Sequence, residues 1–183
     1  MVSKRWFWLA VALQVLLLLG MVGRHAYTVA TGQPILLQTA PVDPWDMFRG
    51  EYVRLNYTIS RIDVAATPTS GGPFKRGQAV WVVMQQGEPS WTLVAVHAAH
   101  PGTAPGQIAL KATVVQEQWG ESQRPQPMLL EYGIEQFYVP EGEGPKLEQA
   151  ARDHKLTVQV LVDNFGRAVV HKVFTDGQEV RWR

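Results

Sequence analysis

The sequence predicts a mainly β protein, in which an N-terminal transmembrane helix is followed by a curled antiparallel sheet or small barrel with one short helix. Three observations support this fold class. The first is a long uncharged apolar run near the N-terminus. The second is a series of short segments that alternate apolar and polar residues between turns rich in glycine and proline. The third is that one later segment, roughly 145–153, carries helical signals and begins with a proline.

The apolar run extends from Trp6 to Gly23 and contains 18 residues without a charge. As a helix rising ~1.5 Å per residue it is about 27 Å long, which nearly matches a hydrocarbon core of ~30 Å. Trp6 and Trp8 lie at one end, where interfacial aromatic residues are found. We therefore expect residues 1–26 to form a membrane anchor and residues 27–183 to form one extracytoplasmic β-rich domain.

Polar residues in and around this run indicate its orientation and its type. Gln14 is the only strongly polar residue within it, and Lys4 and Arg5 before it favour a cytoplasmic N-terminus. A cleaved signal peptide is the main alternative, but its apolar core is normally ~7–15 residues long and ends at a small-x-small site. Here the run continues into Arg24, and the stretch 28–30 is a poor cleavage site. We therefore favour an uncleaved anchor over a cleaved signal or a buried core helix.

The composition excludes several classes of partner and site. The chain has 17 basic and 16 acidic residues, a formal net charge of +1. Without the three basic residues of the anchor, 14 basic and 16 acidic residues leave the outer domain at −2. No nucleic-acid partner is therefore expected, and the domain has no general attraction to anionic lipid. The absence of cysteine excludes disulfides, cysteine-ligated zinc, iron–sulfur clusters and a thiol nucleophile. No known catalytic, metal or cofactor motif is present, so we assign no catalytic residue, metal or cofactor.

Nine segments carry the alternation expected of β-strands. They are Pro34–Thr39, Glu51–Ile62, Ala79–Gln86, Trp91–His97, Gln107–Gln116, Met128–Val139, Leu156–Asp163, Ala168–Phe174 and Glu179–Arg183. Turn signals at 164–166 and 176–177 lie between adjacent runs, so the last third of the chain is expected to form a meander. Glu141 or Glu143 is expected to cap the short helix.

The stretch from Asp43 to Tyr57 has the most distinctive pattern in the chain. Asp43 before Pro44 favours a turn, and Gly50 permits a positive φ. In the strand that follows, successive side chains fall on opposite faces. The expected core face holds Val53, Leu55 and Tyr57, and the opposite face holds Tyr52, Arg54 and Asn56.

Glu51 shares the parity of the core face, so its carboxylate is expected where the strand enters the core. An unpaired buried charge is costly. The partners near in sequence are Arg49, Arg54 and Arg61. One interpretation makes Glu51 part of a polar site at the mouth of a barrel. The interpretation we favour is that Glu51 accepts hydrogen bonds from turn N–H groups and stays solvated.

The sequence Gly50-Glu51-Tyr52-Val53-Arg54-Leu55-Asn56-Tyr57 resembles the motif for which the GDYXXLXY protein family, a set of bacterial membrane-anchored proteins, is named. One position departs from the pattern: Glu51 replaces the family's usual aspartate, which keeps the charge but lengthens its reach by one methylene. The resemblance extends upstream to residues 41–44. It returns in residues 132–144, which are similar to the family's second signature. It covers the anchor and nearly the whole outer domain.

The resemblance implies a partner, because members of this family often occur alongside, or fused to, a multi-span membrane protein. It implies a single-pass accessory or interaction subunit of the bacterial inner (cytoplasmic) membrane, in contact with lipid through its N-terminal helix. The two signatures are expected to form one contact or pocket surface. The candidate residues are Arg49, Gly50, Glu51, Tyr52, Arg54, Leu55, Tyr57, Tyr132, Glu135, Tyr138 and Glu141.

Two other functions remain open. A periplasmic ligand-binding or sensory domain would have a pocket near the first signature, where Glu51 and Arg54 would orient a ligand. The residues lining that pocket would be Tyr52, Tyr57, Tyr132 and Tyr138. A hydrolase or transferase would need a carboxylate pair that the fold builds from Glu51, Glu135 and Glu141.

Overall fold

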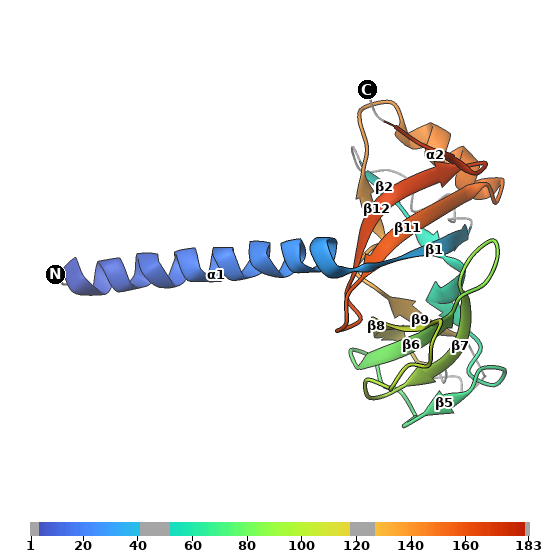
Figure 1. Ribbon diagram of the computed structural model, residues 1–183, viewed down its shortest axis with the longest axis horizontal. Helices are drawn as coiled ribbons and strands as arrows, with labels where there is room; N and C mark the ends of the chain where they lie inside the picture. Colours follow the sequence, from blue (N-terminus) through green and yellow to red (C-terminus); the bar gives the residue numbers. More distant parts are fainter. Residues whose placement is uncertain (1–3, 41–51, 118–126, 182–183) are drawn as a thin grey trace.

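The computed structural model describes residues 4–40, 52–117 and 127–181 of the chain. It confirms the expected fold class, because a long N-terminal helix leads into a β-rich domain of curled sheets with one further short helix (Figure 1). The long helix is α1 (Lys4–Thr31) and the short helix is α2 (Gly144–Arg152).

The strands of the described residues form two large sheets and one small one. They are β1 (Gln33–Ala40), β2 (Tyr52–Arg54), β3 (Asn56–Tyr57), β4 (Arg61–Ile62), β5 (Thr69–Ser70), β6 (Ala79–Gln85), β7 (Thr92–His97), β8 (Gln107–Gln116), β9 (Met128–Glu131), β10 (Gln136–Tyr138), β11 (Leu156–Val162), β12 (Ala168–Thr175) and β13 (Gln178–Glu179). The strand orders are β13-β12-β11-β1-β3, β4-β9-β8-β6-β7-β5 and β10-β2. The adjacency of β11, β12 and β13 confirms the meander, and within the described part of the chain only β5 and β7 pair in parallel.

The segment expected as one strand, Glu51–Ile62, is divided because it changes partners along its length. β2 pairs with β10, β3 with β1, and β4 with β9. A segment that passes between three sheet edges must bend, and a 3₁₀ turn, η2 (Thr58–Ser60), makes one of the bends. The core face is as expected, since Val53, Leu55 and Tyr57 are each at most 2% exposed.

The expected strand Met128–Val139 is also interrupted, between β9 and β10. Gly133 in this interruption has a φ of +79°, in the left-handed region that glycine adopts readily. The turn shifts the alternation of side chains by one residue. Tyr132 and Ile134 are buried in the core, but farther along the odd-numbered Val139 takes the inward position.

The two large sheets share one hydrophobic core. Burial alternates along β8 from Leu110 to Val114: Leu110 and Val114 are buried, whereas Lys111 and Thr113 are exposed. Burial of each large aliphatic side chain contributes about 1.5–3 kcal/mol to folding. The period-two pattern of the sequence therefore selects which face of each strand joins this core.

The short helix α2 forms because its apolar residues recur at helical spacing. Leu147, Ala150 and Ala151 are buried where α2 contacts β1, β2 and β11. Pro145 occupies the first turn, as expected. Glu143 directly precedes the helix, but its carboxylate accepts a hydrogen bond from Lys146 at 2.8 Å instead of capping a backbone N–H.

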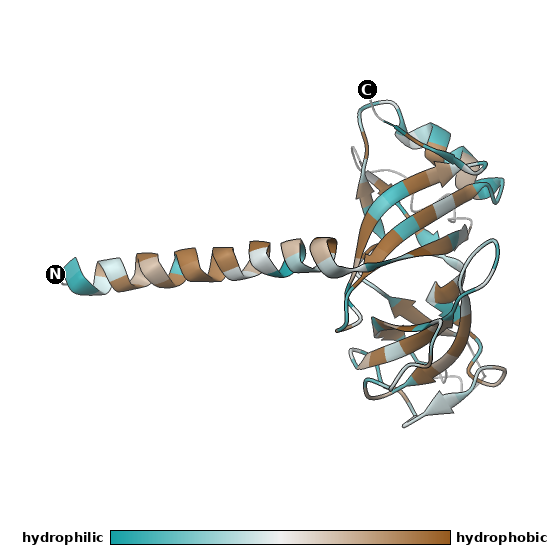
Figure 2. Cartoon of the chain, in the orientation of Figure 1, coloured by the Kyte–Doolittle hydropathy of each residue, from teal (hydrophilic) through white to brown (hydrophobic). Residues whose placement is uncertain are grey.

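The helix α1 projects from one side of the β-domain (Figure 1) and is apolar along most of its length (Figure 2). Only Thr28 among its 28 residues is buried. At ~1.5 Å per residue the helix is about 42 Å long. It is the one helix of the described residues that is long and apolar enough to cross a membrane. It continues past residue 26 to Thr31, and β1 begins after a single intervening residue, Gly32.

The base of α1 is held by the turn between β11 and β12. Asp163 in this turn is 2% exposed and accepts a hydrogen bond from the hydroxyl of Thr28 at 2.7 Å. It also accepts hydrogen bonds from the backbone N–H groups of Phe165, at 2.9 Å, and Arg167, at 3.0 Å. A buried carboxylate needs such donors to replace its lost hydration. The rings of Tyr27 and Phe165 also meet, with centroids 6.1 Å apart.

The same turn connects the two large sheets. The carbonyl oxygen of Gly166 accepts a hydrogen bond from the N–H of Lys111 on β8 at 2.7 Å. Gly166 has a φ of +78°, and a Cβ atom there would lie 2.7 Å from the carbonyl oxygen of Ala109. Both the backbone conformation and the close approach therefore require glycine at this position.

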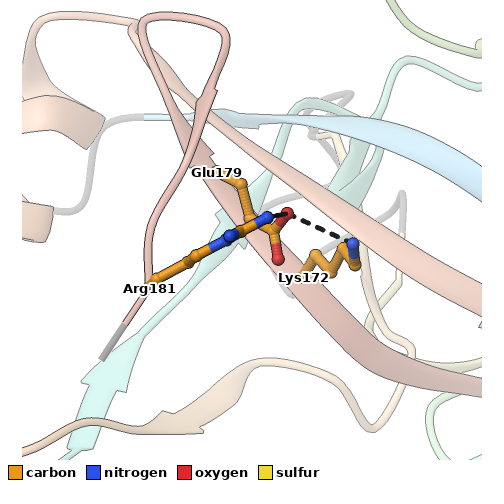
Figure 3. Close-up of polar contacts among 3 residues, drawn as sticks. All are labelled: Lys172, Glu179 and Arg181. Carbon is orange, nitrogen blue, oxygen red and sulfur yellow. Dashed lines mark hydrogen bonds and ion pairs between the residues drawn. The ribbon is translucent and has the colours of Figure 1, made fainter. Parts of the chain in front are cut away.

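The outer edge of the five-stranded sheet carries a small ion cluster (Figure 3). The carboxylate of Glu179 lies 3.2 Å from Nζ of Lys172 and 3.4 Å from Arg181. The hydrogen bond from Lys172 lowers the pKa of Glu179, and Arg181 lowers this pKa further. A lowered folded-state pKa means that the stabilisation is complete above the unfolded-state pKa and is lost as the pH falls through the folded-state pKa. Charges here also discourage another chain from pairing with the sheet edge.

We expect Gly166→Ala to lower the free energy of unfolding by about 2–5 kcal/mol, since it adds backbone strain and a steric clash with β8. Gly177→Ala is the matched control, because Gly177 has the same φ of +78° but no atom within 4 Å of its Cβ position. It should cost only about 1–2 kcal/mol. Guanidinium unfolding of the full-length protein in mild detergent, followed by tryptophan fluorescence, measures both. Equal losses would contradict the close packing of the turn on β8.

Candidate functional site

The structure brings the described parts of the two signatures side by side. β2 of the first signature pairs antiparallel with β10 of the second, with Arg54 opposite Gln136 and Val53 opposite Phe137. The N–H of Leu55 donates a hydrogen bond to the carbonyl oxygen of Glu135 at 2.7 Å. Two motifs that lie far apart in the sequence therefore form one continuous piece of structure.

Two tyrosines brace the signatures reciprocally. The hydroxyl of Tyr57 donates to the carbonyl oxygen of Ile134 at 2.8 Å, and the hydroxyl of Tyr132 donates to that of Ile59 at 2.7 Å. Both tyrosine side chains are buried. Burial raises the pKa of both hydroxyls, and the negative charge of Glu135 raises it further. Both tyrosines therefore stay protonated and keep donating at physiological pH.

The carboxylate of Glu135 closes the turn before β10. One of its oxygens accepts a hydrogen bond from the N–H of Tyr132, and the other accepts one from the N–H of Gly133 at 2.9 Å. The side chain is half-buried, and these two donors compensate its charge. Glu135 thus holds the shape of the second signature, whatever else it contacts.

The candidate residues fall into groups that differ in their exposure. Those outside the described residues are Arg49, Gly50 and Glu51, so the predicted pairing of Glu51 with Arg49, Arg54 or Arg61 falls on a residue outside them. The buried ones are Leu55, Tyr57 and Tyr132. The exposed ones are Arg54, Tyr138 and Glu141. Tyr52 is a residue of β2 and stands opposite Tyr138 in the register. Glu135 is intermediate in exposure.

A groove of about 490 Å³ opens beside the paired signatures, and we call it the signature groove. Its polar lining residues are Arg54, Asn56, Ser60, Arg61, Glu131 and Glu135. Two guanidinium groups and two carboxylates therefore line one space. The hydroxyl oxygen of Ser60 is buried and has no hydrogen-bond partner among the described residues.

The chemistry of the signature groove favours binding. Cations and anions in one groove suit a ligand or peptide segment that carries both charges. In residues 4–40, 52–117 and 127–181, no group of three His, Cys, Asp or Glu side chains is arranged to hold a metal ion. Sequence reasoning missed Ser60 and Glu131 and gave Arg61 only as a possible partner of Glu51. They lie together because β4 pairs with β9, which no local pattern indicates.

We expect Tyr57→Phe to lower the free energy of unfolding by about 1–3 kcal/mol, because the buried carbonyl of Ile134 loses its donor while the ring still packs. Urea unfolding followed by circular dichroism measures this loss. Tyr27→Phe is the control, since the exposed Tyr27 hydroxyl donates to no residue that the structure describes. If the two substitutions cost the same, the Tyr57 hydroxyl does not brace the signatures.

Comparison with known proteins identifies a family. A family model described as GDYXXLXY protein matches residues 14–173, which include most of α1 and both signatures. A search of curated proteins and a search of solved structures each found no match. The family match covers most of the chain, and the leucine and last tyrosine of the motif are Leu55 and Tyr57, which are buried where the two signatures meet. The chain therefore belongs to the GDYXXLXY protein family.

Proposed function

We propose that this chain is a single-pass membrane-anchored protein of the bacterial inner membrane, with its β-domain on the extracytoplasmic side. In this proposal it acts as an accessory or interaction subunit for a multi-span membrane protein. Support comes from the exposure of α1, from one polar residue within α1, and from the surface that the paired signatures form.

The exposure of α1 supports an anchor, because the described residues leave most of its apolar side chains uncovered. Trp6, Leu16 and Leu19 are 69%, 67% and 65% exposed. A helix of a soluble domain normally buries one apolar stripe against its own core. A helix that is apolar all round and stands free of its domain is suited to lipid. Trp8 at one end and Tyr27 at the other flank the run, as interfacial aromatic residues do.

Gln14 is the single observation that carries the proposal of a membrane partner. Its side-chain amide lies near the middle of the apolar run and hydrogen-bonds to no residue that the structure describes. An amide in hydrocarbon is unfavourable unless a neighbouring helix supplies a partner. Such an interhelical hydrogen bond contributes about 1 kcal/mol, so a second transmembrane helix that met Gln14 would gain stability there.

Outside the membrane, the exposed signature residues suit contact with a protein. Arg54, Tyr138 and Glu141 are exposed, and Tyr138 has 74% of its surface accessible. Arginine and tyrosine are enriched among the residues that carry most binding energy at interfaces. β2 and β10 form the small two-stranded sheet, so a partner could contact them without disturbing the two large sheets.

Crosslinking and affinity purification of the tagged full-length protein from native membranes tests this proposal. We expect one multi-span protein to be recovered with the wild type and with Gln14→Asn, which keeps the amide. Recovery should fall about fivefold with Gln14→Leu, which removes it. Arg54→Ala reports separately on the signature surface.

Three outcomes would contradict or change this proposal, each in a different way. Recovery of the wild-type chain alone, across several mild detergents, would contradict an accessory role. Recovery of a second copy of the chain would replace that role with self-association. Full recovery with Gln14→Leu but loss with Arg54→Ala would move the contact out of the membrane and onto the signatures.

Ligand binding in the signature groove is a second candidate function, favoured by its four charged side chains and by the buried hydroxyl of Ser60. We expect a ligand with both charges to raise the melting temperature of the full-length protein in mild detergent, and Arg61→Ala to abolish the shift. A screen of metals, sugars, peptides and lipid headgroups that stabilises nothing would count against this function.

A further inference from the structure

A second groove, of about 520 Å³, lies where α1 meets the β-domain, and we call it the basal groove. The helix lines it with Met21, Arg24 and Thr28, which share one helical face. β8 and the start of β12 line the other side. The charged or titratable lining residues are Arg24, His25, Lys111, Glu131 and Arg167.

The basal groove is cationic, although the outer domain as a whole is not. Arg24, Lys111 and Arg167 are its basic side chains of the arginine and lysine type, and Glu131 is the one carboxylate among the lining residues. None of these three cations forms an ion pair with a residue that the structure describes. Aromatic rings hold two of them instead: Lys111 lies 5.6 Å from the centroid of Trp81, and Arg167 lies 5.3 Å from that of Phe165. These contacts position the cations and leave their N–H donors available.

The position of the basal groove along α1 matches the headgroup layer of a bilayer. Met21 lies in the last turn of the apolar run, Arg24 follows the run directly, and Thr28 lies one turn farther. From Met21 to Thr28 the groove follows the helix for about 10 Å, of which about 7 Å lies beyond the end of the apolar run, and a headgroup layer is about 5–8 Å thick. Tyr27 and Phe165, 41% and 56% exposed, lie at the same level, where interfacial aromatic residues belong.

We propose that the basal groove binds the headgroup phosphate of an anionic phospholipid, an inference that rests on the membrane anchoring proposed above. Arg24 and Arg167 supply guanidinium donors that suit phosphate oxygens, and Lys111 supplies a further positive charge. Three cations against one carboxylate favour a lipid with net negative charge over a zwitterionic one. The lipid would contact α1 and the β-domain at once, and so fix the domain against the bilayer surface.

Native mass spectrometry of the full-length protein in mild detergent tests this site. The protein is titrated with an equimolar mixture of phosphatidylglycerol and phosphatidylcholine that have the same acyl chains. Lys111→Gln/Arg167→Gln removes two cations of the groove. The control variant Lys146→Gln/Lys155→Gln removes two exposed cations that lie outside the groove. Lys155 directly precedes β11, whereas Asp163 directly follows it. Inorganic phosphate is titrated in a parallel arm.

The wild type should prefer phosphatidylglycerol, and this preference should fall about fivefold or more in Lys111→Gln/Arg167→Gln and stay unchanged in the control variant. Equal binding of the two lipids by the wild type, or the same loss in both variants, would overturn the proposal. If inorganic phosphate binds as tightly as the lipid, the ligand of the groove is a free anion and not a lipid. If circular dichroism shows that the first variant does not fold, Arg24→Gln/Lys111→Gln takes its place.

A separate measurement distinguishes the absence of a lipid site from the absence of a membrane anchor. The full-length protein is reconstituted into vesicles of the two lipids and washed with alkaline carbonate. Release of the protein would refute the anchor itself. Retention without a preference for phosphatidylglycerol would refute the lipid site alone.

Discussion

The buried carboxylate of Asp163 is the constraint on which the arrangement of the other parts depends. It accepts hydrogen bonds from Thr28 of α1 and from two backbone N–H groups of its own turn. The same turn, through Gly166, accepts a hydrogen bond from Lys111 of the second large sheet. One residue thus links the long helix, the first sheet and, through its turn, the second sheet. Because only Gly32 separates α1 from β1, the junction contains no long linker, and we expect the β-domain to hold one orientation relative to the helix. This fixed orientation sets how far each groove stands from the end of the apolar run.

Different residues of the two signatures stabilise the fold and form the exposed surface. Leu55, Tyr57 and Tyr132 are buried, and the two tyrosine hydroxyls brace one signature against the other. Packing alone accounts for these residue types, because a buried carbonyl needs a donor and a core position needs an apolar body. The exposed residues Arg54 and Tyr138 are not accounted for by burial, and their exposure suits contact with a partner. A substitution at Tyr57 should therefore act through stability, whereas one at Arg54 should act through binding.

Local pattern predicted most of the elements, because helices and strands are set by the periodicity of apolar residues. It predicted α2 to within one residue at each end and predicted the C-terminal meander, although α1 extends beyond the expected anchor to Thr31 and β13 ends at Glu179. It failed where a segment changes partners, as in the division of Glu51–Ile62, and where Gly133 interrupts a run, because both depend on pairings between distant parts of the chain. A pocket near the first signature was expected, but the lining of the signature groove by Ser60 and Glu131 was out of reach for the same reason. So was the basal groove, which joins Arg24, Lys111 and Arg167 from three separate segments. Asp163 itself stood at the end of an expected strand, but nothing in the sequence indicated its bond to Thr28.

The most direct test of the fixed junction is a distance distribution between α1 and the β-domain. The chain has no native cysteine, so spin labels can be attached at Val22→Cys on α1 and Gln178→Cys on β13, both exposed positions. Pulsed electron paramagnetic resonance of the full-length protein in lipid nanodiscs then reports the distribution of distances between them. The fixed junction predicts one narrow peak that broadens when Asp163→Ala is added to the labelled chain. A broad distribution before that substitution, or a narrow one that Asp163→Ala leaves unchanged in a folded protein, would contradict it.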